Sequence, residues 1–393
     1  MLNISYSLLI FSFVLLFGYF GEILFKKTRI SPFIFLILIG ILFGYLNIVS
    51  YSSLLPIISY VAIVTLLLII FQGGVDLTIE ELTKYSWRPV LQVILYVGFS
   101  FFGVTMFLHY VLNLSFIESE IIASIFSGET STILIIPLSR ELKIKRGSVI
   151  FLTLESSLNS VVLTILFTLL ISNSYFTFQT FIYSIISSVA IGLVIGFLLS
   201  IIWIRIMNKF ELKEYIYALT IGLLVLTYVI IYYLNGNEYI GALVFGSVLG
   251  NYKRLDRFLG KINMKDSLDH VFKFNKELTF LLRSFFFFYL GISMNILSPH
   301  LLYLFSISLV LFGILMLARF VAVNISTYKS DFRVDKDKLF IMMAQGLTVI
   351  TLVALAQSYN LPLISEFAVI IGFLVLLTNI FSAISLYLLK SSI

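Results

Sequence analysis

Residues 127–138 read Ser-Gly-Glu-Thr-Ser-Thr-Ile-Leu-Ile-Ile-Pro-Leu, and they lie in the middle of an apolar stretch at about 119–139. Serine and threonine compete with the helix backbone for hydrogen bonds, glycine favours non-helical conformations, and Pro137 removes a further backbone bond. A helix interrupted in this way survives in lipid only where its freed backbone groups line a cavity. The pattern therefore predicts a functional broken helix. Close packing of small residues is the alternative, and it leaves Glu129 unexplained.

The composition around this stretch is that of a membrane protein. The chain has 393 residues, of which 60% are hydrophobic and 12% charged, whereas soluble domains carry about 25% charged residues. A water-soluble enzyme is therefore excluded, and we expect one transmembrane domain over residues 1–393. The absence of cysteine and the presence of only three histidines exclude disulfides and metal clusters. No cofactor is expected.

Thirteen apolar stretches follow one another, and the basic residues between them indicate an orientation. With the N-terminus outside, all but two of the 26 basic residues fall in inner loops and none falls in an outer loop. The apolar stretches predict an all-α, multi-pass protein of the cell membrane. The positive-inside rule places its N-terminus outside and its C-terminus inside. The longest loop, at about 251–277, is expected to be a cytoplasmic linker. The stretches lie at about 3–24, 31–48, 56–74, 89–112, 119–139, 148–172, 177–204, 215–234, 238–250 (re-entrant or tilted), 278–296, 301–323, 339–357 and 363–389.

A few charged residues fall inside these apolar stretches. A charge at bilayer depth costs about 2.5–3.5 kcal/mol, so it usually lines a cavity or has a partner. Glu22 is one turn from Lys26 and predicts an ion pair at the membrane surface. Glu155 shares a helix face with Asn159, and Arg319 is its expected charge partner. A buried structural ion pair is the simplest interpretation of Glu155 and Arg319.

Several segments together resemble the monovalent cation:proton antiporter superfamily, in particular the Na⁺/H⁺ exchangers of the NhaP type. No single motif is highly specific, and the resemblance depends on their common order along nearly the whole chain. The matching segments are FQGGVDL (71–77), SGETSTILIIPL (127–138), LESSLNS (154–160), ALVFGSVLGN (242–251), SFFFFYLG (284–291), ARFVAV (318–323) and QGL (345–347).

The resemblance implies an inverted-repeat fold with two broken helices that cross near the membrane midplane. These are the fifth and twelfth stretches, with Gly128, Gln345 and Gly346 in the core of the crossing. The family's structural ion pair corresponds to Glu155 and Arg319. The family also implies a homodimer.

Two positions depart from the family pattern, and they bear on the mechanism. Ser160 stands where the family has its ion-binding aspartate, and Gln345 stands where it has an arginine. Serine cannot titrate, so we expect Glu129 to be the carboxylate that exchanges a proton for a cation. The expected oxygen ligands beside it are Asn159, Ser160, Thr130 and Ser131.

The sequence thus predicts a secondary transporter that exchanges Na⁺ or K⁺ for protons by alternating access. Its expected partners are monovalent cations, protons and the lipid bilayer, and not nucleic acid. The missing aspartate and arginine leave two alternatives open. One is a proton-uncoupled cation channel or uniporter, and the other is a transport-inactive scaffold or sensor. A membrane enzyme is not expected, because no nucleophile–base pair is evident.

Overall fold

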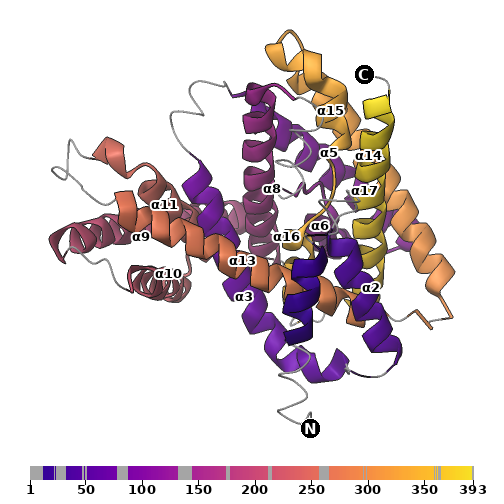
Figure 1. Cartoon of the computed structure of the whole chain (residues 1–393), viewed down its shortest axis with the longest axis horizontal. Helices are drawn as coiled ribbons and strands as arrows, with labels where there is room; N and C mark the ends of the chain where they lie inside the picture. The colour runs from indigo at the N-terminus through magenta and orange to yellow at the C-terminus, as the bar shows by residue number, and fades with distance from the viewer. Residues whose placement is uncertain are drawn as a thin grey trace. The chain divides into compact units, whose positions relative to one another are not determined.

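All the regular secondary structure in the residues that the computed structural model describes is helical (Figure 1). The prediction of an all-α protein is confirmed for this part of the chain. The described residues are 12–21, 23, 32–46, 48, 51–77, 87–131, 144–173, 178–210, 215–255, 265–294, 296–297, 299–357, 359, 361 and 364–391.

The helices have the lengths that a multi-span membrane protein needs. Seven helices in the described ranges are long and apolar enough to cross a bilayer. Four shorter apolar helices accompany them, at Ser12–Gly21, Phe33–Tyr45, Glu238–Gly250 and Leu347–Ala356. The chain is therefore a multi-span membrane protein.

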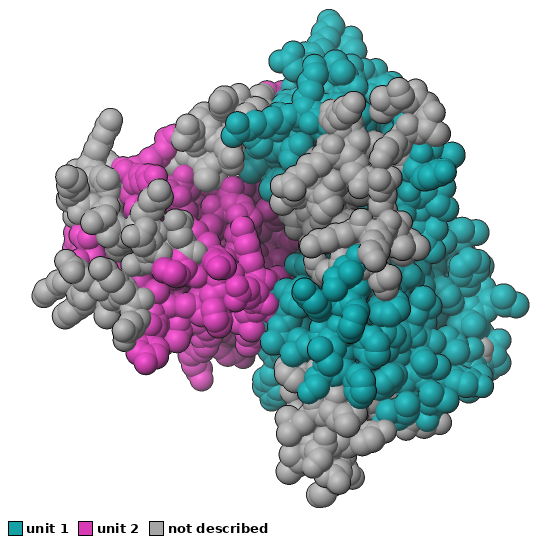
Figure 2. Space-filling model, in the orientation of Figure 1, with its two compact units in different colours: residues 1–63, 88–156, 280–393 teal, residues 64–87, 157–279 magenta. Residues whose placement is uncertain are grey.

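The chain divides into two compact units, shown in teal and magenta in Figure 2. Unit 1 comprises Met1–Ile63, Arg88–Ser156 and Phe280–Ile393, and unit 2 comprises Val64–Trp87 and Ser157–Thr279. Three helices run from one unit into the other: α3 (Tyr51–Asp76), α8 (Arg146–Asn173) and α13 (Lys265–Ser293). The other elements of unit 1 are α2 (Pro32–Tyr45), α5 (Arg88–Leu112), α6 (Phe116–Phe126), α14 (Leu301–Ser326), η2 (Asp331–Asp335), α15 (Lys336–Ile341), α16 (Leu347–Ala356) and α17 (Ile364–Ser391). Those of unit 2 are α9 (Phe178–Phe210), α10 (Ile216–Tyr233), α11 (Glu238–Gly250) and η1 (Tyr252–Leu255).

Glycines allow the helices of each unit to approach closely. In unit 1, a Cβ atom on Gly40 of α2 would clash with the backbone of Phe288 and Gly291 in α13. In unit 2, a Cβ atom on Gly196 of α9 would lie 2.6 Å from the carbonyl oxygen of Gly241 in α11. Small residues at such contacts are the usual means of packing helices in a membrane.

Helix α16 lies in the core of unit 1. All ten of its residues are buried, and it packs against α6 and α17. A helix that is apolar on every side has no face suited to water, and one of ten residues is too short to span a bilayer. The backbone groups at the two ends of α16 must therefore be satisfied inside the protein.

Helix α6 begins and ends at points that its local sequence explains. Ser115 caps its N-terminus by accepting from the Glu118 amide, and the Glu118 carboxylate accepts from the Ser115 amide, which completes a capping box. The helix ends at Phe126, immediately before the Ser-Gly-Glu run. The remainder of the predicted broken helix, with Pro137, lies outside the described residues.

The expected linker at 251–277 is partly helical. Helix α13 already begins at Lys265, so residues 265–277 continue directly into the apolar stretch that follows. Leu268, Val271 and Asn275 are buried and give this first part of the helix an inward face. Residues 256–264 lie outside the described ranges.

Candidate functional site

A buried ion pair joins α8 to α14 in unit 1. Glu155 Oε1 lies 2.6 Å from Arg319 Nη1, and neither side chain is exposed to solvent. Arg319 Nη2 lies 3.4 Å from the other carboxylate oxygen. Gln92 of α5 also donates to Glu155 Oε1, at 3.4 Å, and it accepts a hydrogen bond from Ser326. Removing one partner of such a pair leaves a buried charge without compensation.

Arg319 has a second set of partners at the end of α15. Its Nε donates to the carbonyl oxygen of Phe340 at 3.0 Å, and its Nη2 donates to that of Leu339 at 2.7 Å. The carbonyl groups in the last turn of a helix have no intrahelical partner and carry partial negative charge. The guanidinium also lies 5.0 Å from the centre of the Tyr96 ring. Arg319 therefore fixes Glu155 and the C-terminus of α15 at the same time.

The five residues after α6 form a buried segment that is not helical. Residues 127–131 are each less than one-tenth exposed, so their backbone groups need partners from other elements. Serine side chains and a second non-helical segment supply them. The hydrogen bonds run from the Gly128 amide to Ser100 Oγ (2.9 Å), from Ser156 Oγ to the Thr130 carbonyl (2.5 Å) and from the Ser131 amide to the Ala344 carbonyl (2.8 Å).

Glu129 extends from this segment to the N-terminus of α16. Its carboxylate accepts a hydrogen bond of 2.5 Å from the amide of Gly346, the N-cap residue of that helix. Thr348 contributes two further hydrogen bonds, from its hydroxyl and from its amide. The side chain of Glu129 is 2% exposed, and within the described residues no ion pair reaches it. The helix N-terminus stabilises the negative charge with neutral donors alone.

Two glycines allow this arrangement. A Cβ atom on Gly346 would lie 3.1 Å from the Ser131 Cβ and 3.2 Å from Glu129 Oε1. A Cβ atom on Gly128 would overlap the ring of Tyr96, at 2.5 Å from its carbon atoms. Gly128 and Gly346, two of the three residues predicted for the core of the crossing, thus lie where a larger side chain would not fit.

Residues 342–346, between α15 and α16, form the second non-helical segment, and α17 satisfies their neighbouring backbone groups. Three polar side chains on one face of α17 make these contacts. Thr378 Oγ1 accepts from the Gln345 amide (3.2 Å), Asn379 Nδ2 donates to the Gln345 carbonyl (3.1 Å) and Ser382 Oγ donates to the Ile341 carbonyl (2.8 Å).

These α17 residues and Gln92 are not among the site residues predicted from the sequence. The prediction depended on charged side chains and on runs of small polar ones in the apolar stretches. Uncharged polar residues that recur on one helix face would have been the signal. Thr378, Asn379 and Ser382 recur in this way, at intervals of one and three residues.

The predicted site residues fall into both units. The structure brings together Glu129, Thr130, Ser131 and Gly346 in unit 1, and it joins Glu155 to Arg319. Asn159 and Ser160 lie one turn beyond Glu155 in α8, on the part of that helix that belongs to unit 2. Both are buried, at 0% and 8% exposure. A ligand set that combines them with Glu129 stays a prediction.

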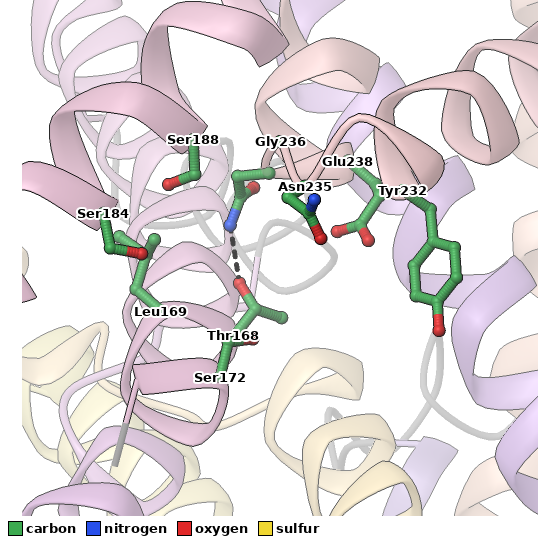
Figure 3. Close-up of a pocket in the computed structure, with 10 residues that line it drawn as sticks. Thr168, Leu169, Ser172, Ser184, Ser188, Tyr232, Asn235, Gly236 and Glu238 are labelled. Carbon is green, nitrogen blue, oxygen red and sulfur yellow. Dashed lines mark hydrogen bonds between the residues drawn. The ribbon is translucent and has the colours of Figure 1, made fainter. Parts of the chain in front are cut away.

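A polar pocket of about 340 Å³ lies within unit 2 (Figure 3). Its lining includes several hydroxyl groups, two amides and the carboxylate of Glu238. Asn237 organises it, since its Oδ1 caps α11 by accepting from the Ile240 amide and its Nδ2 donates to Thr168 Oγ1 at 2.8 Å. None of the residues predicted from the sequence lines this pocket.

Comparisons with known proteins agree with this architecture. A search of curated proteins found no match. Among solved structures, the sodium proton antiporter MjNhaP1 from Methanocaldococcus jannaschii at pH 8 is similar, with a TM-score of 0.81 and 19% sequence identity over 97% of this chain and all of that one. A three-dimensional electron-microscopy map of the same antiporter gives a TM-score of 0.76 and 20% identity, over all of this chain and 98% of that one. At these identities the likeness concerns the fold.

The family comparison covers almost the whole chain. The model of the transmembrane sodium/hydrogen exchanger family matches residues 11–389, which include every element described above except the last two residues of α17. The resemblance found in the sequence motifs is therefore confirmed: the chain belongs to the sodium/hydrogen exchanger family.

Proposed function

We propose that the protein exchanges a monovalent cation, Na⁺ or K⁺, for protons across the cell membrane by alternating access, with Glu129 as the exchanging carboxylate. The observation that carries the proposal is the environment of Glu129. It is a buried carboxylate that extends from one non-helical segment to the end of the other, and its partners in the described residues are amide and hydroxyl groups.

This environment suits a carboxylate that exchanges its counter-ion. A buried carboxylate without a basic partner must bind either a proton or a cation to neutralise its charge. It cannot bind both in the same place, so the two compete, and their competition couples the two fluxes. A guanidinium at the same position would compensate the charge permanently and remove the need for either ion.

The other proposed ligands and the proposed topology are those that the sequence predicts. The hydroxyl and carbonyl oxygens of Thr130 and Ser131 are proposed ligands, with Asn159 and Ser160 from α8. These oxygen ligands suit a hard monovalent cation. We propose thirteen spans with the N-terminus outside and the C-terminus inside. We also propose a homodimer, as the family resemblance implies.

Transport by the purified protein in liposomes tests the proposal. A pH gradient should drive uptake of Na⁺ or K⁺, and Glu129→Gln should abolish both the cation flux and the linked proton flux. Glu118→Gln is the matched control, because it makes the same substitution at the capping box of α6, where glutamine can replace glutamate. It should transport like the wild type.

Two results would contradict the proposal. If Glu129→Gln transports at the wild-type rate, Glu129 is not the exchanging group. If the cation flux of the wild type is indifferent to the pH gradient, the protein is an uncoupled channel or uniporter.

A further inference from the structure

Two buried amide side chains next to the Glu129 contact have polar atoms without a hydrogen-bond partner. Gln345 is 0% exposed, and within the described residues neither its Oε1 nor its Nε2 makes a hydrogen bond. Asn379 is 1% exposed, and no donor in the same part of the chain reaches its Oδ1. Buried polar atoms of this kind are rare and costly, and each needs an explanation, such as a bound ion or water.

The orientation of Asn379 is fixed by its other contacts. Its Nδ2 donates to the carbonyl oxygens of Val375, at 2.8 Å, and Gln345, at 3.1 Å. Turning the amide over would place Oδ1 against these two carbonyl oxygens, so the flipped orientation is unfavourable. Asn379 Oδ1 is therefore held as an acceptor with no donor facing it.

The residues that carry these unpaired atoms are linked to the Glu129 contact. Gln345 directly precedes Gly346, whose amide binds the Glu129 carboxylate. The carbonyl group of Gln345 accepts the hydrogen bond from Asn379. Glu129, Gly346, Gln345 and Asn379 thus form a continuous series of contacts within unit 1.

We propose that the side chains of Gln345 and Asn379 form a neutral oxygen site for a partly dehydrated monovalent cation, adjacent to Glu129. Amide oxygens coordinate such cations in place of water. Asn379 Oδ1 supplies a fixed ligand, and Gln345 Oε1 supplies one that can adjust. Gln345 Nε2 donates to a water molecule that accompanies the ion. The inference rests on the proposed function, because the cation bound here is the one that Glu129 exchanges.

The substitution Gln345→Met tests this site without removing a structural hydrogen bond. Because neither polar atom of the side chain is paired, the variant should fold and be at least as stable as the wild type in cation-free buffer. Purified protein is titrated with NaCl or KCl against choline chloride, and the rise in unfolding temperature is followed. The half-maximal cation concentration should increase about tenfold, the change expected for loss of one good ligand.

Two further variants are measured in the same way. Gln357→Met makes the same substitution at the opposite end of α16 and should leave the half-maximal concentration at the wild-type value. Glu129→Gln should weaken cation binding further and abolish exchange, which tests the proposed function separately. Gln345→Met should weaken cation binding in the Glu129→Gln background too.

The results separate the two proposals. If Gln345→Met keeps the wild-type cation dependence while Glu129→Gln abolishes exchange, the amides hold water only and the neutral site is refuted. If Glu129→Gln exchanges normally, the proposed function is refuted, and the titrations of Gln345→Met still decide whether the amides bind the cation.

Discussion

Two glutamates are almost fully buried in the described part of unit 1, and their charges are compensated in opposite ways. Glu155 contacts the guanidinium of Arg319 at 2.6 Å and receives a further hydrogen bond from Gln92. Glu129 receives hydrogen bonds from the N-terminus of α16 and the Thr348 hydroxyl. A permanent counter-charge makes Glu155 a structural group. Neutral donors leave Glu129 able to accept a mobile positive charge.

The same contrast holds for the two helices on either side of residues 342–346. The C-terminus of α15 receives the positive charge of Arg319, and the N-terminus of α16 receives the negative charge of Glu129. Each charge has the sign that stabilises its helix end. Protonating Glu129 or pairing it with a cation would weaken only the second of these contacts. The ion that we propose for Glu129 would therefore act on α16 and not on the Glu155–Arg319 pair.

The largest effect should come from breaking the structural pair. Glu155→Gln leaves the Arg319 guanidinium buried without its carboxylate, which should cost about 3–5 kcal/mol. We expect a marked fall in the unfolding temperature in detergent, and less folded protein in the membrane fraction. Substituting both partners, Glu155→Leu with Arg319→Met, should restore most of the loss. A single variant as stable as the wild type would show that the pair is not structural.

An intermediate effect should come from filling the space beside Glu129. Gly346→Ala places a Cβ atom 3.1 Å from Ser131 and 3.2 Å from Glu129 Oε1, and overpacking of this kind costs about 1–3 kcal/mol. We expect a lower unfolding temperature and weaker cation-dependent stabilisation. Gly313→Ala is the matched control, because a Cβ atom there would have no neighbour within 4 Å. Equal effects of the two variants would mean that the contact at Gly346 is not tight.

The smallest effect should come from a third carboxylate, Asp335, at the end of η2 and outside the helices long enough to span a bilayer. Both a charged group and neutral donors compensate its charge. Burial raises the pKa of Asp335, but hydrogen bonds from Lys338, the Ser148 hydroxyl and the Lys145 amide outweigh it. The pKa therefore lies below its ordinary value of 3.8. The folded state binds this proton less readily than the unfolded state, so the stabilisation is present above pH 3.8 and is lost as the pH falls through the folded-state pKa.

Thermal unfolding between pH 6 and pH 3 checks this prediction. The unfolding temperature of the wild type should fall more steeply below about pH 4 than that of Asp335→Asn, which lacks the titrating group. Parallel curves for the two proteins would show that the contacts of Asp335 do not stabilise the fold.

The sequence could predict the parts of this arrangement that depend on charge. A carboxylate and a guanidinium in apolar stretches need compensation, so Glu155 and Arg319 are recognised as partners although 163 residues separate them. The Ser-Gly-Glu run identified the non-helical segment, because its residues are weak helix formers. Which atoms bind Glu129 could not be predicted, because the amide of Gly346 is a backbone group that carries no sequence signal.

The contribution of α17 could not be predicted for a related reason. Thr378 and Ser382 can hydrogen-bond to their own helix, and Thr378 also does so, to the Leu374 carbonyl at 2.9 Å. A hydroxyl group in an apolar helix can therefore be satisfied by its own helix and need not contact another element. Only the folded chain shows that α17 supplies the partners of residues 341–345.

The most direct test of the central claim is the release of protons when a cation binds. Purified protein in weakly buffered detergent solution receives Na⁺ or K⁺, with choline as the control cation, and a pH indicator records the change. If Glu129 is the exchanging carboxylate, the wild type and Glu118→Gln release protons and Glu129→Gln releases none. Proton release from Glu129→Gln equal to that of the wild type would contradict the account.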